Sequence, residues 1–153
     1  MFKLISSLIN LNVGLATKAR SIMAYDEALA FYSAKDYKQA IPLMIEASEL
    51  GNAQAMSMLG TMHLMGEGVK ENGAEAVKWL QAAVDGGYED ALSVLGMAYA
   101  TGKGGIKIDL PRAQKILAHC SEKGDQQSKK MLSMIENGEG MFKNCKKKSG
   151  QRR

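Results

Sequence analysis

The chain repeats itself with a period of 36 to 37 residues, and this period restricts its fold more than any other feature. Self-similarity at such a fixed period is typical of repeat proteins, in which each repeat is one supersecondary unit that buries its apolar face against its neighbours. The positions that keep this step are Leu59, Leu95 and Leu132; Ala55, Ala91 and Ser128; Ala40, Ala76 and Ala113; and Gly51, Gly87 and Gly124.

Each repeat divides into two helical halves joined by a glycine-rich loop, at residues 66–69 and again at residues 102–106. In both halves small and apolar residues recur at steps of three and four, which is the spacing of one helix face. Only two prolines and 6% aromatic residues occur, so the composition also favours helix over strand. The sequence therefore predicts an all-α superhelix, a right-handed solenoid of helix-turn-helix repeats, with the first helices lining its concave side.

Residues typical of helix ends stand where this division needs them. Asn72 and Asp109 are predicted N-caps, and Pro111 lies in the first helical turn, where its missing N–H costs nothing. The loop glycines are expected to supply positive φ angles for a tight reversal. The glycines expected to close the second helices, as C′ residues, are Gly51, Gly87 and Gly124.

These residues resemble the Sel-1-like repeat, a relative of the tetratricopeptide repeat. Residues 55–87 follow its pattern of Ala-x3-Leu-Gly, Gly-x-Gly-Val and Lys-Ala-x2-Trp almost position for position, with departures at His63, Asn72 and Glu75. Residues 91–124 match again, with Ile116 in place of the tryptophan and His119-Cys120 in place of two alanines. The resemblance implies units at 24–51, 53–87 and 89–124, and a half-repeat at 126–137.

The chain is accordingly expected to contain a repeat domain at residues 21–138 and a basic disordered tail at 139–153. Residues 141–153 carry six of the twenty basic residues and no acid, so the net charge of +4 belongs to this tail. The tail is a candidate for contact with nucleic acid or an acidic surface, although terminal lysine runs usually stay solvated.

Residues 1–20 have two interpretations. Leucines at helical spacing favour an amphipathic N-terminal helix and a cytoplasmic protein. The outline of a weak signal peptide, with cleavage near Ala16, favours a periplasmic or secreted protein instead. The apolar run is too short for a transmembrane segment.

The resemblance also implies where a partner would bind. Another protein or peptide segment is expected in the concave groove, and no small-molecule substrate is expected. An alternative is an exported inhibitor or immunity-type protein that neutralises an enzyme or effector. The groove positions carried over from the tetratricopeptide register are Tyr25, Leu29, Tyr32, Gln54, Ser57, Thr61, Leu64, Met65, Asp90, Ser93 and Met97.

No catalytic residue, metal ligand or cofactor is predicted, because the sequence contains no nucleophile-elbow, zinc or phosphate-loop spacing. Cys120 falls at a repeat position that needs a small buried group, and His119 at an exposed one. His63 replaces the repeat's tyrosine and is expected to pack with one hydrogen bond, while Trp79 occupies a core position.

Overall fold

The computed structural model describes the backbone of residues 2–138 and the side chains of residues 10–138. The expected basic tail at 139–153 therefore lies outside the described residues. Within them the chain forms only helices and loops, as predicted. The helices are α1 (Phe2–Ser33), α2 (Tyr37–Glu49), α3 (Ala53–Met65), α4 (Gly73–Asp85), α5 (Ala91–Thr101), the short 3-10 helix η1 (Lys103–Gly105), α6 (Leu110–Glu122) and α7 (Gln126–Asn137).

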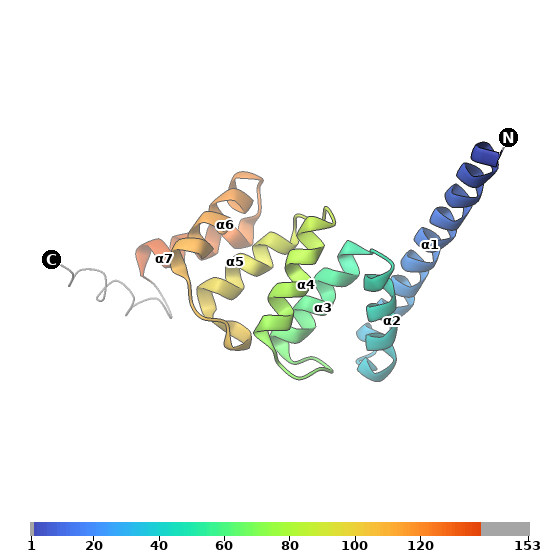
Figure 1. Cartoon of the computed structure of the whole chain (residues 1–153). Helices are drawn as coiled ribbons and strands as arrows, with labels where there is room; N and C mark the ends of the chain where they lie inside the picture. The colour runs from blue at the N-terminus through green and yellow to red at the C-terminus, as the bar shows by residue number, and fades with distance from the viewer. Residues whose placement is uncertain (1, 139–153) are drawn as a thin grey trace.

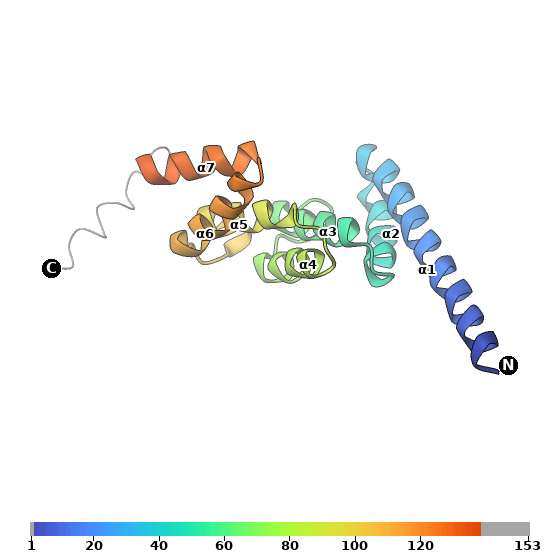
Figure 2. The same ribbon diagram turned by 90° about the horizontal axis from the view of Figure 1, so that it is seen from above.

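Successive helices pack as hairpins, α1 with α2, α3 with α4 and α5 with α6, and the hairpins stack into an elongated array that ends with α7 (Figure 1; Figure 2). Ala76 and Ala113, which the period makes equivalent, are both fully buried in one core cluster. A second cluster joins the first hairpin to α3 through Met44 and Leu59. The predicted solenoid is therefore confirmed.

The first helix of the array is longer than the sequence suggested. α1 runs without a break through 32 residues, so the expected N-terminal helix and the first helix of the repeat domain are one element. α1 contains no proline. Its one glycine, Gly14, lowers helix stability by only about 1 kcal/mol relative to alanine, which is too little to end the helix. None of the helices in the described part of the chain is both long enough and apolar enough to cross a bilayer.

The turns between repeats share one hydrogen-bond pattern. After α2, the Gly51 N–H donates to the Ser48 carbonyl at 3.0 Å and the Asn52 N–H donates to the Ala47 carbonyl at 2.9 Å. These two bonds define a Schellman motif, and Gly51 has a φ of +87°, as predicted for a C′ residue. Equivalent pairs of bonds follow α4 and α6 at Gly87 and Gly124.

The loops within the hairpins are closed by the predicted N-caps. The side chain of Asn72 accepts hydrogen bonds from two backbone N–H groups at the start of α4, and Asp109 accepts one from the Arg112 N–H at the start of α6. The backbone N–H groups of the same two residues donate back to His63 and Tyr99, at 2.9 and 3.0 Å. The cap residue thus ties the start of each second helix to the last turn of the first.

Each glycine loop also packs on the preceding repeat. A Cβ placed on Gly68 would lie 2.3 Å from the Cβ of Tyr37, at the start of α2. One repeat later, a Cβ on Gly104 would lie 2.9 Å from the Cα of Gly73, at the start of α4. The loop glycines therefore serve the contact between repeats as well as the reversal of the chain.

Candidate functional site

The first helix of each repeat leaves one stripe of side chains uncovered. On α3 this stripe contains Gln54, Met58, Thr61 and Met65, at successive steps of four, three and four. Gln54 is exposed, Met58 and Thr61 are half-buried, and Met65 is 50% exposed. Positions with this spacing lie along one side of a helix, so α3 presents a continuous strip to solvent.

The same strip recurs on the other first helices, because stacked repeats place equivalent positions on the same side. Its charged or polar end lies at Lys18, Gln54, Asp90 and Gln127, while the rest is mainly apolar and rich in methionine. We call this mainly apolar part the open face. Its residues are Ile22, Tyr25 and Leu29 on α1; Met58, Thr61 and Met65 on α3; Val94, Met97 and Thr101 on α5; and Met131 and Met134 on α7.

Most of the predicted groove residues lie on or beside the open face. Tyr25, Leu29, Tyr32, Thr61, Ser93 and Met97 are half-buried, and Gln54, Met65 and Asp90 are exposed.

The prediction is wrong for Leu64 and Ser57. Leu64 is only 2% exposed and belongs to the core, because the loop that contains Gly104 folds over the end of α3. Ser57 is 8% exposed and contributes little surface. Neither side chain is available to a partner in this structure.

The sequence interpretation also missed part of the open face. Ile22, Met58, Val94, Met131 and Met134 belong to it but were not among the predicted groove residues. The helical spacing could have identified two of them. Met58 lies four residues after Gln54 and three before Thr61, and Val94 lies at the same steps between Asp90 and Met97.

One end of the α1 strip is fixed by a loop. The hydroxyl of Tyr32 donates a short hydrogen bond to the carboxylate of Glu67, which lies in the loop between α3 and α4. This bond, followed by burial, raises the pKa of Tyr32 to about 12. The Tyr32 ring also meets Tyr37 edge to face, with centroids 5.6 Å apart. Tyr32 therefore holds the first two repeats together and has no free hydroxyl hydrogen for a partner.

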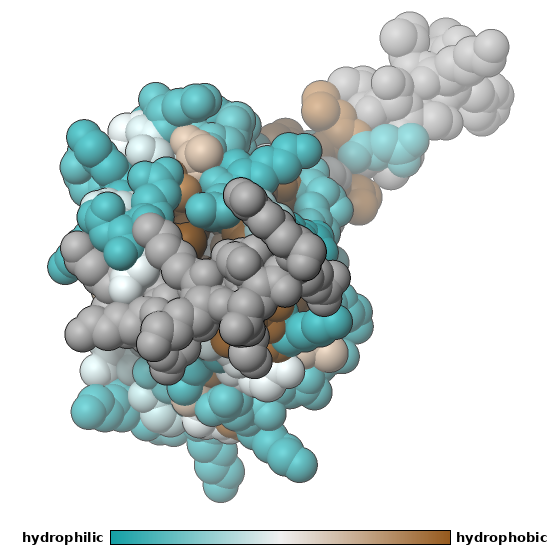
Figure 3. All heavy atoms as spheres, turned by 90° about the vertical axis from the view of Figure 1, so that its left-hand side faces the viewer, coloured by the Kyte–Doolittle hydropathy of each residue, from teal (hydrophilic) through white to brown (hydrophobic). Residues whose placement is uncertain are grey.

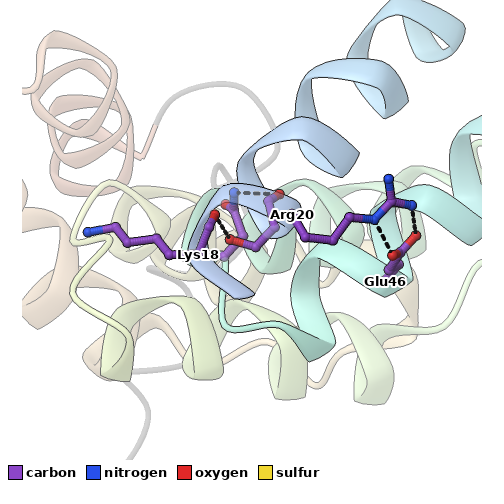
Figure 4. Close-up of polar contacts among 5 residues, drawn as sticks. Lys18, Arg20 and Glu46 are labelled. Carbon is purple, nitrogen blue, oxygen red and sulfur yellow. Dashed lines mark hydrogen bonds and ion pairs between the residues drawn. The ribbon is translucent and has the colours of Figure 1, made fainter. Parts of the chain in front are cut away.

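Two hollows lie beside the polar ends of these strips. One, of about 590 Å³, lies between α1 and the turns that precede α3 and α5, and its lining includes Lys18, Ser21 and Tyr88. Across this hollow the Asn52 side chain donates to the Ser21 carbonyl at 3.4 Å. Figure 4 shows that Lys18, which lines the hollow, and Arg20, which does not, extend in opposite directions from α1, and that Arg20 pairs with Glu46, at 2.6 Å.

The other hollow, of about 520 Å³, lies between the start of α5 and the turn after α6. Its rim carries both signs of charge, since the Lys123 ammonium pairs with Glu89. Its lining includes Asp90 and Ser93, two of the predicted groove residues.

The histidines and the described cysteine form no reactive group in the structure. Cys120 is 7% exposed, and burial raises the pKa of its thiol, while His119 is exposed, as predicted for both. His63 differs from the prediction, because its buried Nδ1 has no hydrogen-bond partner among the described residues. No three described His, Cys, Asp or Glu side chains are grouped so that they could hold a metal ion.

Trp79 packs against the second core cluster, as predicted, and the Lys78 ammonium lies 5.7 Å from its ring centroid.

The solved structures similar to this chain include two proteins that each match with a TM-score of 0.64. One is a protective antigen present in uropathogenic Escherichia coli strains, whose crystal structure displays an SLR fold; it is 28% identical, and the match covers 71% of this chain and 24% of that protein. The other is a Sel1 repeat protein from Oxalobacter formigenes; it is 24% identical, with 72% and 45% covered. This chain thus spans less than half the length of either protein. Comparison with curated protein sequences gives no significant match.

The family model described as Sel1 repeat matches residues 23–52, 53–88 and 90–125, together more than half of the chain. The period, the helical hairpins and their Gly-x-Gly loops agree with this match, and the chain belongs to the Sel1 repeat family.

Proposed function

We propose that this protein is a non-enzymatic adaptor that binds an apolar or amphipathic segment of a partner protein along its open face. Sel1 repeats are generally protein–protein interaction modules. The observation that supports a docking role for this face is its recurrence, since four successive first helices each leave partly or fully exposed apolar side chains at steps of three and four. A contiguous exposed apolar patch on a protein surface typically marks an interaction site.

The composition of the open face suits a partner segment of variable shape. Five of its residues are methionines, whose unbranched and polarisable side chains adapt to irregular surfaces. Tyr25 adds a large ring with a polar tip, and burial raises the pKa of its hydroxyl, so it remains a neutral hydrogen-bond donor at physiological pH. Such a face binds mainly through apolar contact.

The test is affinity capture of partners by the full chain, followed by the same capture with Met65→Lys and Met97→Lys combined. Met65 is 50% exposed, whereas Met97 is half-buried against a core cluster, where the apolar stem of a lysine can take its place while the charge reaches the face. We expect the partners to be lost, because each lysine would have to be desolvated in the interface.

The matched control is Met23→Lys, which places the same charge on α1 at a side chain that is 63% exposed and lies off the open face. It should retain the partners. Circular dichroism would verify that all variants keep their helicity. Undiminished capture by the Met65 and Met97 variant would exclude the open face as the binding surface.

A further inference from the structure

The part of α1 that precedes the repeats has its polar side toward the stack. Asn10, Gly14 and Thr17 continue, at helical steps of four and three, the line of the buried residues Ser21 and Ala24. Gly14 and Thr17 line the hollow between α1 and the turns of the next two repeats. A surface helix of a globular protein ordinarily turns its apolar side toward the rest of the protein. This segment instead turns its polar side toward the stack.

The opposite side of the same segment is apolar and uncovered. Counted at about 100° per residue, it spans about 200° of the helix surface. Ala16 and Ala19 lie on it and are exposed, and Asn12 is its one uncharged polar residue among residues 10–23. Its large side chains are 59% to 63% exposed: Leu11, Val13, Leu15 and Met23.

The segment also stands clear of the stack. In Figures 1 and 2 the N-terminal half of α1 projects past α2 at the end of the array opposite α7. Figure 3, which views the molecule from the α7 end, shows hydrophobic residues on this projecting helix. The N-terminal part of this helix therefore extends beyond the repeats.

Charge is segregated along the chain in a way that matches an anionic surface. Residues 1–25 contain Lys3, Lys18 and Arg20 and no acid, and residues 141–153 contain six basic residues and no acid. The remaining eleven basic and sixteen acidic residues lie between them, which gives the repeats a net charge of −5. An anionic surface would therefore attract both ends of the chain and repel the repeats.

We infer that the projecting half of α1 lies in the interface of an anionic lipid bilayer, with its apolar side among the acyl chains. Helices of this kind bind through buried apolar area together with basic side chains that reach the headgroups. Lys18 and Arg20 stand near the two edges of the apolar side. Arg20 pairs with Glu46, and Lys18 makes no ion pair among the described residues, so Lys18 is free to meet a lipid headgroup.

A lipid surface explains this side better than a second copy of the chain. A two-stranded helical interface needs only a narrow seam of apolar residues, whereas this apolar side covers about half of the helix surface, counted as above. Two copies of a segment with three basic residues and no acid would also repel each other.

The experiment is co-sedimentation of the full chain with two kinds of vesicle, phosphatidylcholine alone and phosphatidylcholine with about 30% phosphatidylglycerol. We expect binding to the anionic vesicles that weakens as salt is raised, because salt screens the basic side chains. Leu11→Ser combined with Leu15→Ser should weaken binding at least tenfold, because the two substitutions remove apolar surface that would otherwise be buried among the acyl chains.

The control is Asn10→Ser combined with Thr17→Ser, which introduces the same residue at two positions on the polar side and should leave binding unchanged. Met65→Lys with Met97→Lys should also bind vesicles as well as the original chain, which separates this inference from the proposed adaptor function. Circular dichroism would verify that all variants keep their helicity, and the intact mass of the native protein would show at which residue it begins.

Four results would overturn the inference. Vesicle binding that is absent, or that survives the two leucine substitutions, would show that this side does not enter lipid. A dimer in sedimentation that dissociates in the leucine variant, without vesicle binding, would assign the side to a second copy. A native protein that begins near residue 17 would lack the segment altogether.

Discussion

At the scale of single residues, the helical hairpins depend on two glycines in equivalent positions. A Cβ on Gly60 would lie 2.7 Å from the Cγ of Leu80, and a Cβ on Gly96 would lie 2.8 Å from the Cγ of Leu117. Both leucines are fully buried. The absence of a side chain is what lets the two helices of a hairpin approach this closely, so the glycine and the leucine are one packing unit.

Gly60→Ala should therefore destabilise the protein although alanine favours helix. The added methyl overpacks a buried contact, which costs about 1–3 kcal/mol and exceeds the gain of about 1 kcal/mol in helix propensity. Urea denaturation followed by circular dichroism would measure the difference. Gly14→Ala is the control, because no described atom lies within 4 Å of its Cβ position, and it should not lower stability.

Cys120 should react slowly with alkylating reagents in the native state. Its thiol is buried, and burial raises its pKa, so less thiolate is present at a given pH. In a Cys145→Ser variant, where Cys120 is the remaining cysteine, labelling at pH 8 should accelerate at least about tenfold when urea unfolds the chain. Equal labelling rates in the native and unfolded states would contradict the buried position.

At the scale of elements, the ends of the helices are fixed by short side-chain caps. α7 begins at Asp125, whose carboxylate accepts hydrogen bonds from the Gln127 and Ser128 N–H groups at 3.2 and 3.1 Å and from the Ser128 hydroxyl at 2.5 Å. The hydroxyl of Ser128 is the main cause that lowers the pKa of Asp125. The ionised cap therefore stabilises the start of the last described helix.

Asp125→Ala should cost about 0.5–2 kcal/mol at neutral pH, the usual cost of a lost N-cap. Because folding lowers the pKa of Asp125, its contribution is present above the unfolded value of about 4 and is lost as the pH falls through the folded value. Urea denaturation at pH 7 and at pH 3 should thus give a smaller difference from the original chain at pH 3. Asp85→Ala, at an exposed residue that caps no helix start, should change stability little at either pH.

At the scale of the whole molecule, stability depends on contacts between repeats, because a single hairpin cannot bury its apolar face alone. The stack has two core clusters, one around Met44 and Leu59 and one around Leu80 and Leu117. The glycine loops add a second connection by packing on the preceding repeat, as Gly104 does on Gly73. Loss of such a contact should affect how the repeats unfold together.

Gly104→Ala should reduce stability and the cooperativity of unfolding. Gly105→Ala is a matched control, since both glycines have positive φ, +72° and +77°, but no described atom lies within 4 Å of the Cβ position of Gly105. Both variants should lose about 1–2 kcal/mol to backbone strain, and only Gly104→Ala should add a clash between repeats. Separate urea transitions for Trp79 fluorescence and for circular dichroism would reveal the uncoupling in Gly104→Ala, and coincident transitions would count against it.

Much of the element structure was predictable because it rests on local chemistry. Asn72 and Asp109 act as N-caps, and Gly51 takes its C′ role, through hydrogen bonds to residues within a few positions along the chain. The 36-residue step likewise fixes which positions share an environment, as for Ala76 and Ala113. These features follow from helix geometry, so the sequence alone determined the solenoid and its units of two helices.

The candidate site was predictable only in part, because exposure depends on segments that are distant in sequence. Leu64 was expected in the groove, but a loop about forty residues later covers it. Met58 was overlooked because a methionine on a helix serves equally well as core or as surface until its neighbours are placed.

The sequence by itself thus determined that this chain folds as stacked helical hairpins, since periodic apolar spacing and end caps act within one repeat. Only the tertiary structure decided which side chains remain uncovered, including the apolar side of α1 that points away from its own stack. The physical reason is that burial is a property of packed surfaces, and the packing of each helix is completed by residues from another repeat.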